Sequence, residues 1–258
     1  MVKRIAGLLG LLLIAPVASG ADYAAIPGGV LVSALAVDGA AARIVLKPFA
    51  MRIEPVTNAE FLDFVRMHPE WQRGQVSPLF AGPQYLAAWQ GPLTLGPEAR
   101  PEQPVTGVSW FAARAFCTRE QARLPTWYEW EFVAAADVTR RDARQDPARN
   151  QDILDAIQAA TGRRPGRIGR HPADVWGVRD LNRLLWEWTG DYAAMFPDAD
   201  ARVPGAGASL ALCGGSALAF ADKNQYALMM RVAALTALKP ADAASRVGFR
   251  CVRDLPGE

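Results

Sequence analysis

The sequence predicts an α+β protein in which a few short helices and strands are joined by long irregular segments. Two capping boxes, at 57–60 and 126–129, mark helix starts, because in each a threonine hydroxyl accepts a backbone amide and a glutamate reaches back to the cap. Strand-like patterns occur at 43–46 and 247–252. The helical and extended segments do not alternate regularly, which favours α+β over a series of βαβ units.

The first elements we expect are an opening pair of strands within 26–49, of which 43–46 has the clearest pattern. The first capping box then opens a helix whose apolar residues recur at helical spacing and which ends before Pro69. Residues 70–100 are rich in Pro, Gly and aromatic residues without periodicity, so we expect a packed irregular segment.

Two helices are expected in the middle of the chain. Ser109 begins the first, which carries Cys117 and ends before Pro125. The second capping box opens the other, which runs to about Ala136. We expect its tryptophans to lie in the core rather than stack on a ligand, because they recur at helical offsets.

The second half of the chain contains fewer regular patterns. Mixed charges at 138–149 predict a solvated surface. Residues 151–160 have helical spacing and predict a further helix. Residues 224–231 are apolar with polar interruptions, and 247–252 predict a closing strand.

The N-terminus has the pattern of a signal peptide. Lys3 and Arg4 precede an apolar run at 5–14 and small residues at 16–21. This run is shorter than the roughly 20 residues of a membrane span. We therefore expect residues 1–20 to be removed and 21–258 to form one domain in the periplasm or outside the cell; an uncleaved anchor is the alternative.

The charge and cysteine counts restrict the classes of function. Two of the 28 basic residues lie in the leader, so the rest balance the 26 acidic residues, which argues against a nucleic-acid surface. Cys117, Cys213 and Cys251 are the 3 cysteines. In an exported protein this number predicts one disulfide and one spare thiol, and the count alone leaves all three pairings open.

Common catalytic patterns are missing from the sequence. It has no G-x-S-x-G elbow and no phosphate-binding glycine loop. His68 and His171 are the 2 histidines, and their spacing does not predict a site in which two histidines and a carboxylate hold iron. We expect both to be surface histidines.

Five motifs follow one another in a distinctive order. They are PVTGVSW at 104–110, RLPTWYEWE at 123–131, WEWT at 186–189, GGS at 214–216 and GFRC at 248–251. Together they resemble the formylglycine-generating enzyme and sulfatase-modifying factor family, over about residues 26–254. The resemblance implies a loop-rich fold related to C-type lectins, with a twisted antiparallel sheet. It also implies a disulfide between Cys117 and Cys251.

The resemblance implies a chemistry whose ligands this chain lacks. Family oxidases convert a substrate cysteine to formylglycine with molecular oxygen, at copper(I) held by two thiolates. Those positions would fall near Ala219 and Asn224, and neither carries sulfur. We therefore expect no formylglycine generation by that mechanism. A rebuilt copper site from Cys213 with Met229 or Met230 is a weak candidate, because methionines on an apolar stretch are usually core residues.

The resemblance also implies calcium, at a motif that is altered here. Residues 182–188 read NRLLWEW, in which Leu184 replaces an amide side chain. Calcium takes about six to eight oxygen ligands, so losing one donor weakens the site. Glu187 and Asp191 remain as carboxylate donors.

The resemblance therefore implies a pocket of the family's shape that lacks the family's metal ligands. Arg231 is a candidate anchor for a ligand carboxylate, since a guanidinium binds carboxylates in a fork. The alternative is that Arg231 and Arg250 form structural ion pairs. The expected lining is Trp186, Glu187, Ser216, Asn224, Tyr226, Arg231 and Arg250.

The chain is most similar to an exported branch of the family, the NirV-type proteins encoded near copper nitrite reductases. This similarity implies an accessory or binding role in the maturation of a periplasmic metalloenzyme, with a protein client as the partner. The alternative is a metal-dependent oxidoreductase that acts on a protein or small-molecule substrate through a non-standard site. A lectin-like ligand-binding module is a third hypothesis.

Overall fold

The computed structural model describes residues 21–37, 40–191 and 225–255. Its strands form a three-stranded antiparallel sheet in the order β1-β4-β7, an antiparallel β2-β3 hairpin and a short parallel β5-β6 pair. The strands are β1 (Tyr23–Ile26), β2 (Gly29–Val37), β3 (Ala40–Leu46), β4 (Phe49–Arg52), β5 (Trp186–Glu187), β6 (Val247–Gly248) and β7 (Val252–Asp254).

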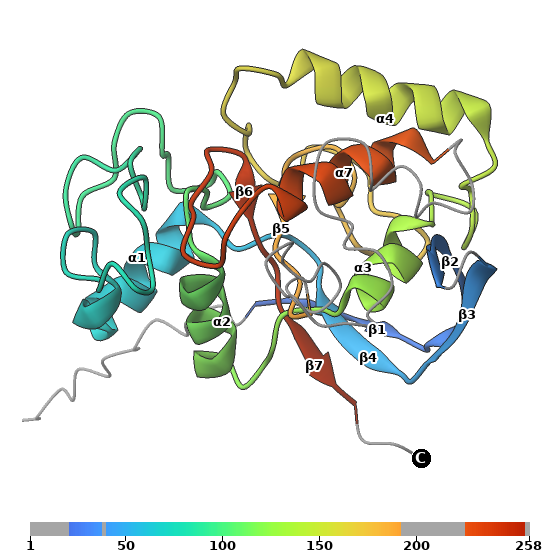
Figure 1. Ribbon diagram of the computed structural model, residues 1–258, viewed down its shortest axis with the longest axis horizontal. Coiled ribbons are helices and arrows are strands. Elements are labelled where there is room, and N and C mark those ends of the chain that lie inside the picture. Colours follow the sequence, from blue (N-terminus) through green and yellow to red (C-terminus); the bar gives the residue numbers. More distant parts are fainter. Residues whose placement is uncertain (1–20, 38–39, 192–224, 256–258) are drawn as a thin grey trace, which may run out of the picture.

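Strand β4 lies between the first and the last strand of the described chain (Figure 1). Met51 pairs with Ala24 on one side and with Val252 on the other. The prediction of one closing strand at 247–252 is wrong, because this part of the chain forms two short strands. β6 pairs with β5, whereas β7 pairs with β4. The chain between these two short strands brings Arg250 into the interior.

The predicted helix starts are confirmed by the hydrogen bonds at their caps. Thr57 and Thr126 each form a complete capping box, and the Ser109 hydroxyl accepts from the amide of Ala112. The helices are α1 (Asn58–Met67), the 3-10 helix η1 (Pro69–Trp71), α2 (Trp110–Arg119), α3 (Trp127–Ala134), α4 (Pro147–Ala159) and α7 (Tyr226–Thr236). Within the described ranges, none of these helices is long and apolar enough to cross a bilayer.

Helix α4 lies beside α7 (Figure 1). The Asp146 carboxylate caps α4 by accepting from the amides of Ala148 and Arg149 at 2.9 and 3.2 Å. The helical pattern at 151–160 therefore predicted α4 correctly, whereas 224–231 gave no indication of α7. Leu228 and Val232 are buried at helical spacing in α7. Val232 lies beyond 224–231, so the helical spacing could not be recognised within that segment alone.

The core consists of two clusters of apolar side chains. The first surrounds α1 and α2 and contains the disulfide between Cys117 and Cys251, whose pairing the family resemblance implied. The second packs α3 and α7 against β1 and β4, and it contains Trp127 and Trp130, which are 0 % and 2 % exposed. Both tryptophans are therefore core residues, as their spacing predicted.

Candidate functional site

A buried ion pair lies at the centre of the candidate site. The Arg250 guanidinium donates to the Glu187 carboxylate, with Nη2 2.9 Å from Oε1 and Nε 2.9 Å from Oε2. Both side chains are 0 % exposed. The indole Nε1 of Trp130 also donates to Oε2 of Glu187 at 3.0 Å. The alternative in which Arg250 forms a structural ion pair is therefore the one observed.

The remaining donors of Arg250 are used by the backbone. Nη1 donates to the carbonyl oxygens of Arg52 and Ile53, and Nη2 donates to that of Arg179. Because every nitrogen of this guanidinium has a partner, Arg250 holds segments of the chain together rather than presenting a free donor to a ligand. Its exposed fraction of 0 % agrees with this role.

The carboxylates expected to remain for calcium are both engaged. Glu187 is neutralised by Arg250, and Oδ1 of Asp191 accepts from the amide of Trp127 at 2.8 Å. Within the ranges that the structure describes, no three His, Cys, Asp or Glu side chains gather where they could hold a metal ion. These side chains do not fit the calcium site that the resemblance implies.

Arg231 is buried in α7, and no carboxylate of the described ranges forms an ion pair with it. Its Nη2 donates to the backbone oxygen of Glu187 at 2.5 Å, and its guanidinium lies 3.5 Å from the ring centroid of Trp130. Nε and Nη1 have no acceptor among the described residues. Burial lowers the pKa of Arg231 to about 9, since desolvation and the charge of Arg250 outweigh the attraction of Glu187. The structural ion pair, which was the alternative to a ligand anchor for this arginine, is not formed within the part of the chain that the structure describes.

The other expected pocket residues are placed differently. Trp186 lines the same small cavity as Arg231. Tyr226 lies at the first turn of α7, is 54 % exposed and lines a neighbouring cavity. Ser216, Asn224 and the weak metal candidate Cys213 lie outside the described residues.

One large cavity was not predicted from the sequence. It has a volume of about 470 Å³ and lies between the end of α3, the first turns of α4 and residues 171–183. Charged side chains line much of it, and Arg183 forms an ion pair with Asp152 across it. Because the lining comes from separate segments between residues 136 and 183, no single local motif could have indicated it.

His171 lies at this cavity, and its side chain is 39 % exposed, so it is a surface histidine as expected, but one with a buried partner. Its Nδ1 lies 2.6 Å from Oδ1 of Asp180, whose side chain is 0 % exposed. The amide of Gly169 donates to the other oxygen of Asp180 at 2.6 Å. The buried carboxylate thus orients the imidazole. His68 lies near the surface beside Glu70, as expected.

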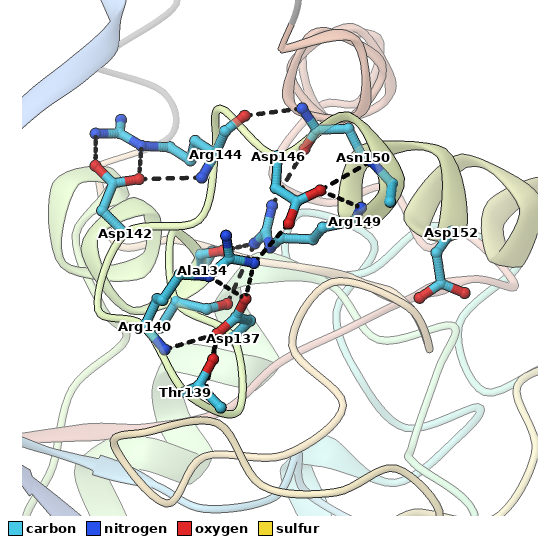
Figure 2. A network of polar contacts seen from close by, with 12 residues as sticks. Ala134, Asp137, Thr139, Arg140, Asp142, Arg144, Asp146, Arg149, Asn150 and Asp152 are labelled. Carbon is cyan, nitrogen blue, oxygen red and sulfur yellow. Dashed lines mark hydrogen bonds and ion pairs between the residues drawn. The ribbon is translucent and has the colours of Figure 1, made fainter.

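The charged segment 138–149 is an ordered network rather than a uniformly solvated face (Figure 2). Arg140 bridges Asp137 and the helix cap Asp146. Arg149 instead reaches inward and donates to the carbonyl oxygens of Ala134 and Ala136 at the end of α3. These contacts hold the start of α4 over α3, and so they position one wall of the large cavity.

A second arginine of this segment also turns inward. Arg144 contacts Glu131 at 3.3 Å, and their side chains are 13 % and 0 % exposed. Glu131 also accepts from the Ser33 hydroxyl and from the Trp127 indole. Burial raises the pKa of Glu131, while these donors and Arg144 oppose the shift. The pattern of mixed charges could not distinguish such buried contacts from exposed ones.

The thiols of this chain do not fit the two-thiolate copper site that the family resemblance implies. Two of its 3 cysteines are joined in the Cys117–Cys251 disulfide, and both are 0 % exposed. Cys213 is the remaining cysteine, so one chain cannot supply a pair of thiolates while the disulfide is intact. Soft thiolate pairs are what favour copper(I) in proteins.

Comparison with known proteins gives the same family. Residues 12–255 match the FGE-sulfatase model, described as the sulfatase-modifying factor enzyme 1-like domain. The chain is 29 % identical to the inactive C-alpha-formylglycine-generating enzyme 2 of Bos taurus, over 86 % of this chain and 83 % of that protein. It is 28 % identical to the formylglycine-generating enzyme of Streptomyces coelicolor, over 81 % and 79 %.

A solved structure supports the fold assignment. PvdO from Pseudomonas aeruginosa superposes with a TM-score of 0.51 and 15 % identity, covering 90 % of this chain and 94 % of that one. At this identity the likeness concerns the fold alone. The loop-rich α+β architecture, the Cys117–Cys251 disulfide and the match over nearly the whole sequence agree, and the chain belongs to the sulfatase-modifying factor enzyme 1-like family.

Proposed function

We propose that this chain is an exported accessory or binding protein that uses the family fold without the thiolate-copper oxidation of cysteine. It would take part in the maturation of a periplasmic enzyme, and its partner would be a protein client. If the similarity to the NirV-type proteins holds, that client is a metalloenzyme. The observation that carries the proposal is the disulfide, which uses two of the 3 cysteines. Cys213 alone cannot form the two-thiolate site that the chemistry requires.

The polar centre of the fold is consistent with this proposal. Glu187 and Arg250 are bound to each other and to the surrounding backbone, so neither is available for proton transfer or metal binding. A relative of similar length is named as an inactive formylglycine-generating enzyme. That name supports the idea that the fold can persist in a protein without the oxidase activity.

Copper binding is the first test of the proposal. The purified chain would be titrated with copper(I) against a competing chelator, alongside Cys213→Ser, and both would be incubated with a thiol peptide and oxygen. We expect no stoichiometric tight copper, no formylglycine and no difference between the two proteins. Tight copper that is lost in Cys213→Ser, or formylglycine in the peptide, would contradict the proposal.

The client and the location need separate experiments. Sequencing the N-terminus of the protein from a periplasmic fraction tests removal of residues 1–20. Chemical crosslinking in living cells, followed by identification of the captured protein, tests for a client. We expect one exported enzyme to be enriched, and its metal content to fall when this chain is deleted. Normal metal loading and activity of every exported enzyme in the deletion strain would overturn the accessory role.

The alternative function is a metal-dependent oxidoreductase with a non-standard site. It is favoured by the names of other relatives, among them the hercynine oxygenase of Mycolicibacterium smegmatis, which is 30 % identical over 55 % of this chain and 37 % of that protein. Against a site at Cys213 and Met229 stands the packing of Met229 on the second core cluster. Copper or iron that co-purifies from the native compartment would favour this alternative.

A further inference from the structure

Among the fully buried side chains of the described residues, the polar centre contains more positive than negative charge. Arg231 and Arg250 are 1 % and 0 % exposed, and the fully buried carboxylate that acts on both is that of Glu187. The partly buried Asp174 also acts on Arg250, but not on Arg231. Arg250 and the indole of Trp130 occupy that carboxylate, whereas Arg231 reaches only the backbone oxygen of the same residue. A buried charge without a counter-charge is strongly unfavourable, so this centre calls for an anion.

The guanidinium of Arg231 has unused donors in a fixed position. It lies 3.5 Å from the ring centroid of Trp130 and 5.8 Å from that of Trp127, so aromatic rings hold it in place. Nε and Nη1 are buried and have no acceptor within the described parts of the chain. Buried donors in native proteins are nearly always satisfied, and those that are not call for an unseen partner.

A small cavity adjoins the side chain of Arg231. It has a volume of about 10 Å³, and Trp130, Trp186, Ile157 and Leu228 form its apolar walls beside Arg231. About 10–15 Å³ is the space that one water-sized particle requires. Chloride and bromide are larger than water, so a halide ion enters only when these side chains move apart slightly, and an organic acid has to enter by its charged end.

The small cavity is separated from the large one by very few side chains. Ile153 of α4, Leu181 and Asn182 line both cavities. The large cavity of about 470 Å³ could hold the body of a small molecule whose charged end points toward Arg231. Displacement of Ile153 would connect the two spaces.

We propose that Arg231 is an anion-binding residue that holds a halide ion or the carboxylate end of a small organic acid in the cavity beneath α4. The anion completes the hydrogen bonding of the guanidinium and balances the second buried arginine. This inference concerns small ligands only and does not depend on the proposed role with a protein client.

The test begins with the wild-type protein and bromide. Crystals soaked in sodium bromide would be examined for an anomalous peak beside Nε or Nη1 of Arg231. In solution, ³⁵Cl line broadening and thermal unfolding at constant ionic strength would compare chloride with fluoride. We expect a bromide peak at this position, chloride broadening that bromide competes away, and a higher Tm in chloride because the anion binds the folded state.

Variants assign the effect to one side chain. Arg231→Met keeps the length and apolar stem but removes the charge, and it should lower the chloride affinity by about 10- to 100-fold, the equivalent of one charged hydrogen bond. Arg114→Met is the matched control, because Arg114 also lies over a tryptophan, 5.4 Å from the ring of Trp110, but is exposed. We expect this control to bind chloride like the wild type.

Competition between bromide and small organic acids identifies the class of anion that binds. Formate, acetate and propionate would be titrated against bound bromide in the wild type and in Ile153→Ala, which joins the two cavities. Competition that strengthens in Ile153→Ala supports an organic acid, and binding of halides alone supports an inorganic ion. Absence of any specific anion effect in the wild type, or a chloride effect that persists unchanged in Arg231→Met, would overturn the proposal.

Discussion

Arg250 and Glu187 join two parts of the fold through a fully buried ion pair. Glu187 belongs to β5, and Arg250 lies between β6 and β7, with Nη2 2.9 Å from Oε1. Arg250 also donates to the carbonyl oxygens of Arg52 and Ile53 at the end of β4. One side chain thus links the β5-β6 pair to the β1-β4-β7 sheet.

Removing Arg250 should destabilise the protein severely. Arg250→Met leaves the Glu187 carboxylate buried without its counter-charge, and breaking such a pair costs about 3–5 kcal/mol. Urea unfolding followed by tryptophan fluorescence would measure the loss of unfolding free energy. Arg66→Met is the control, because Arg66 pairs with Asp63 on the surface, and exposed pairs contribute about 0–1 kcal/mol. Equal losses in both variants would contradict the structural role of Arg250.

The disulfide should contribute substantially to stability. Cys117 and Cys251 are separated by 134 residues, and the chain-entropy model gives a loop of this length about 4–5 kcal/mol as an upper estimate. We expect Cys117→Ala with Cys251→Ala to lower the Tm strongly and to respond no further to reductant. A single Cys213→Ser variant should retain the sensitivity of the wild type to reductant. Loss of that sensitivity in Cys213→Ser would show that another pairing dominates.

Much of the fold followed from local physical chemistry. The threonine and glutamate of each capping box are three residues apart, so Thr57 and Thr126 marked two helix starts without knowledge of their surroundings. The helix α7 was missed, because its apolar residues look like any buried segment until Leu228 and Val232 are seen to share one face. Short strands such as β5 depend on distant partners and carry no periodic signal of their own.

The site was less predictable than the fold. The family resemblance brought Trp186, Glu187, Arg231 and Arg250 together, and the structure places these four in one region. It could not say which arginine would take the carboxylate, since that choice depends on three-dimensional distances. The large cavity and the contact of His171 with Asp180 arise from segments whose charges appeared to be ordinary surface residues.

The capping box of α3 offers a test of local stability. Thr126→Ala removes the hydroxyl that accepts from the amide of Glu129, and loss of such a cap costs about 1 kcal/mol. Thr118→Ala, on the exposed face of α2, should change the unfolding free energy by less than about 0.5 kcal/mol. Chemical denaturation of the two variants would measure the difference, and equal values would argue against the cap.

Asp174 should make the stability depend on pH. Burial raises the pKa of this carboxyl to about 6, above the value near 3.9 of an unfolded chain. Between about pH 4 and 6 the folded state therefore binds more protons than the unfolded state, so this group lowers stability as the pH rises and its effect is complete above about 6. Asp174→Asn should be more stable than the wild type at pH 8 by about 1–2 kcal/mol, after allowance for solvent screening, and similar at pH 4.

The asparagine should be tolerated because it keeps the acceptor that the turn requires. Oδ1 of Asp174 accepts from the amides of Trp176 and Val178 at 2.8 and 3.0 Å, and an amide oxygen can do the same. Asp137→Asn is the control for which we expect the opposite change in stability, since hydrogen bonds with Arg140 hold the pKa of Asp137 below its usual range. That variant should be less stable than the wild type at neutral pH, with the difference vanishing in acid. If urea unfolding shows the same pH dependence in both variants, the burial of Asp174 does not cause it.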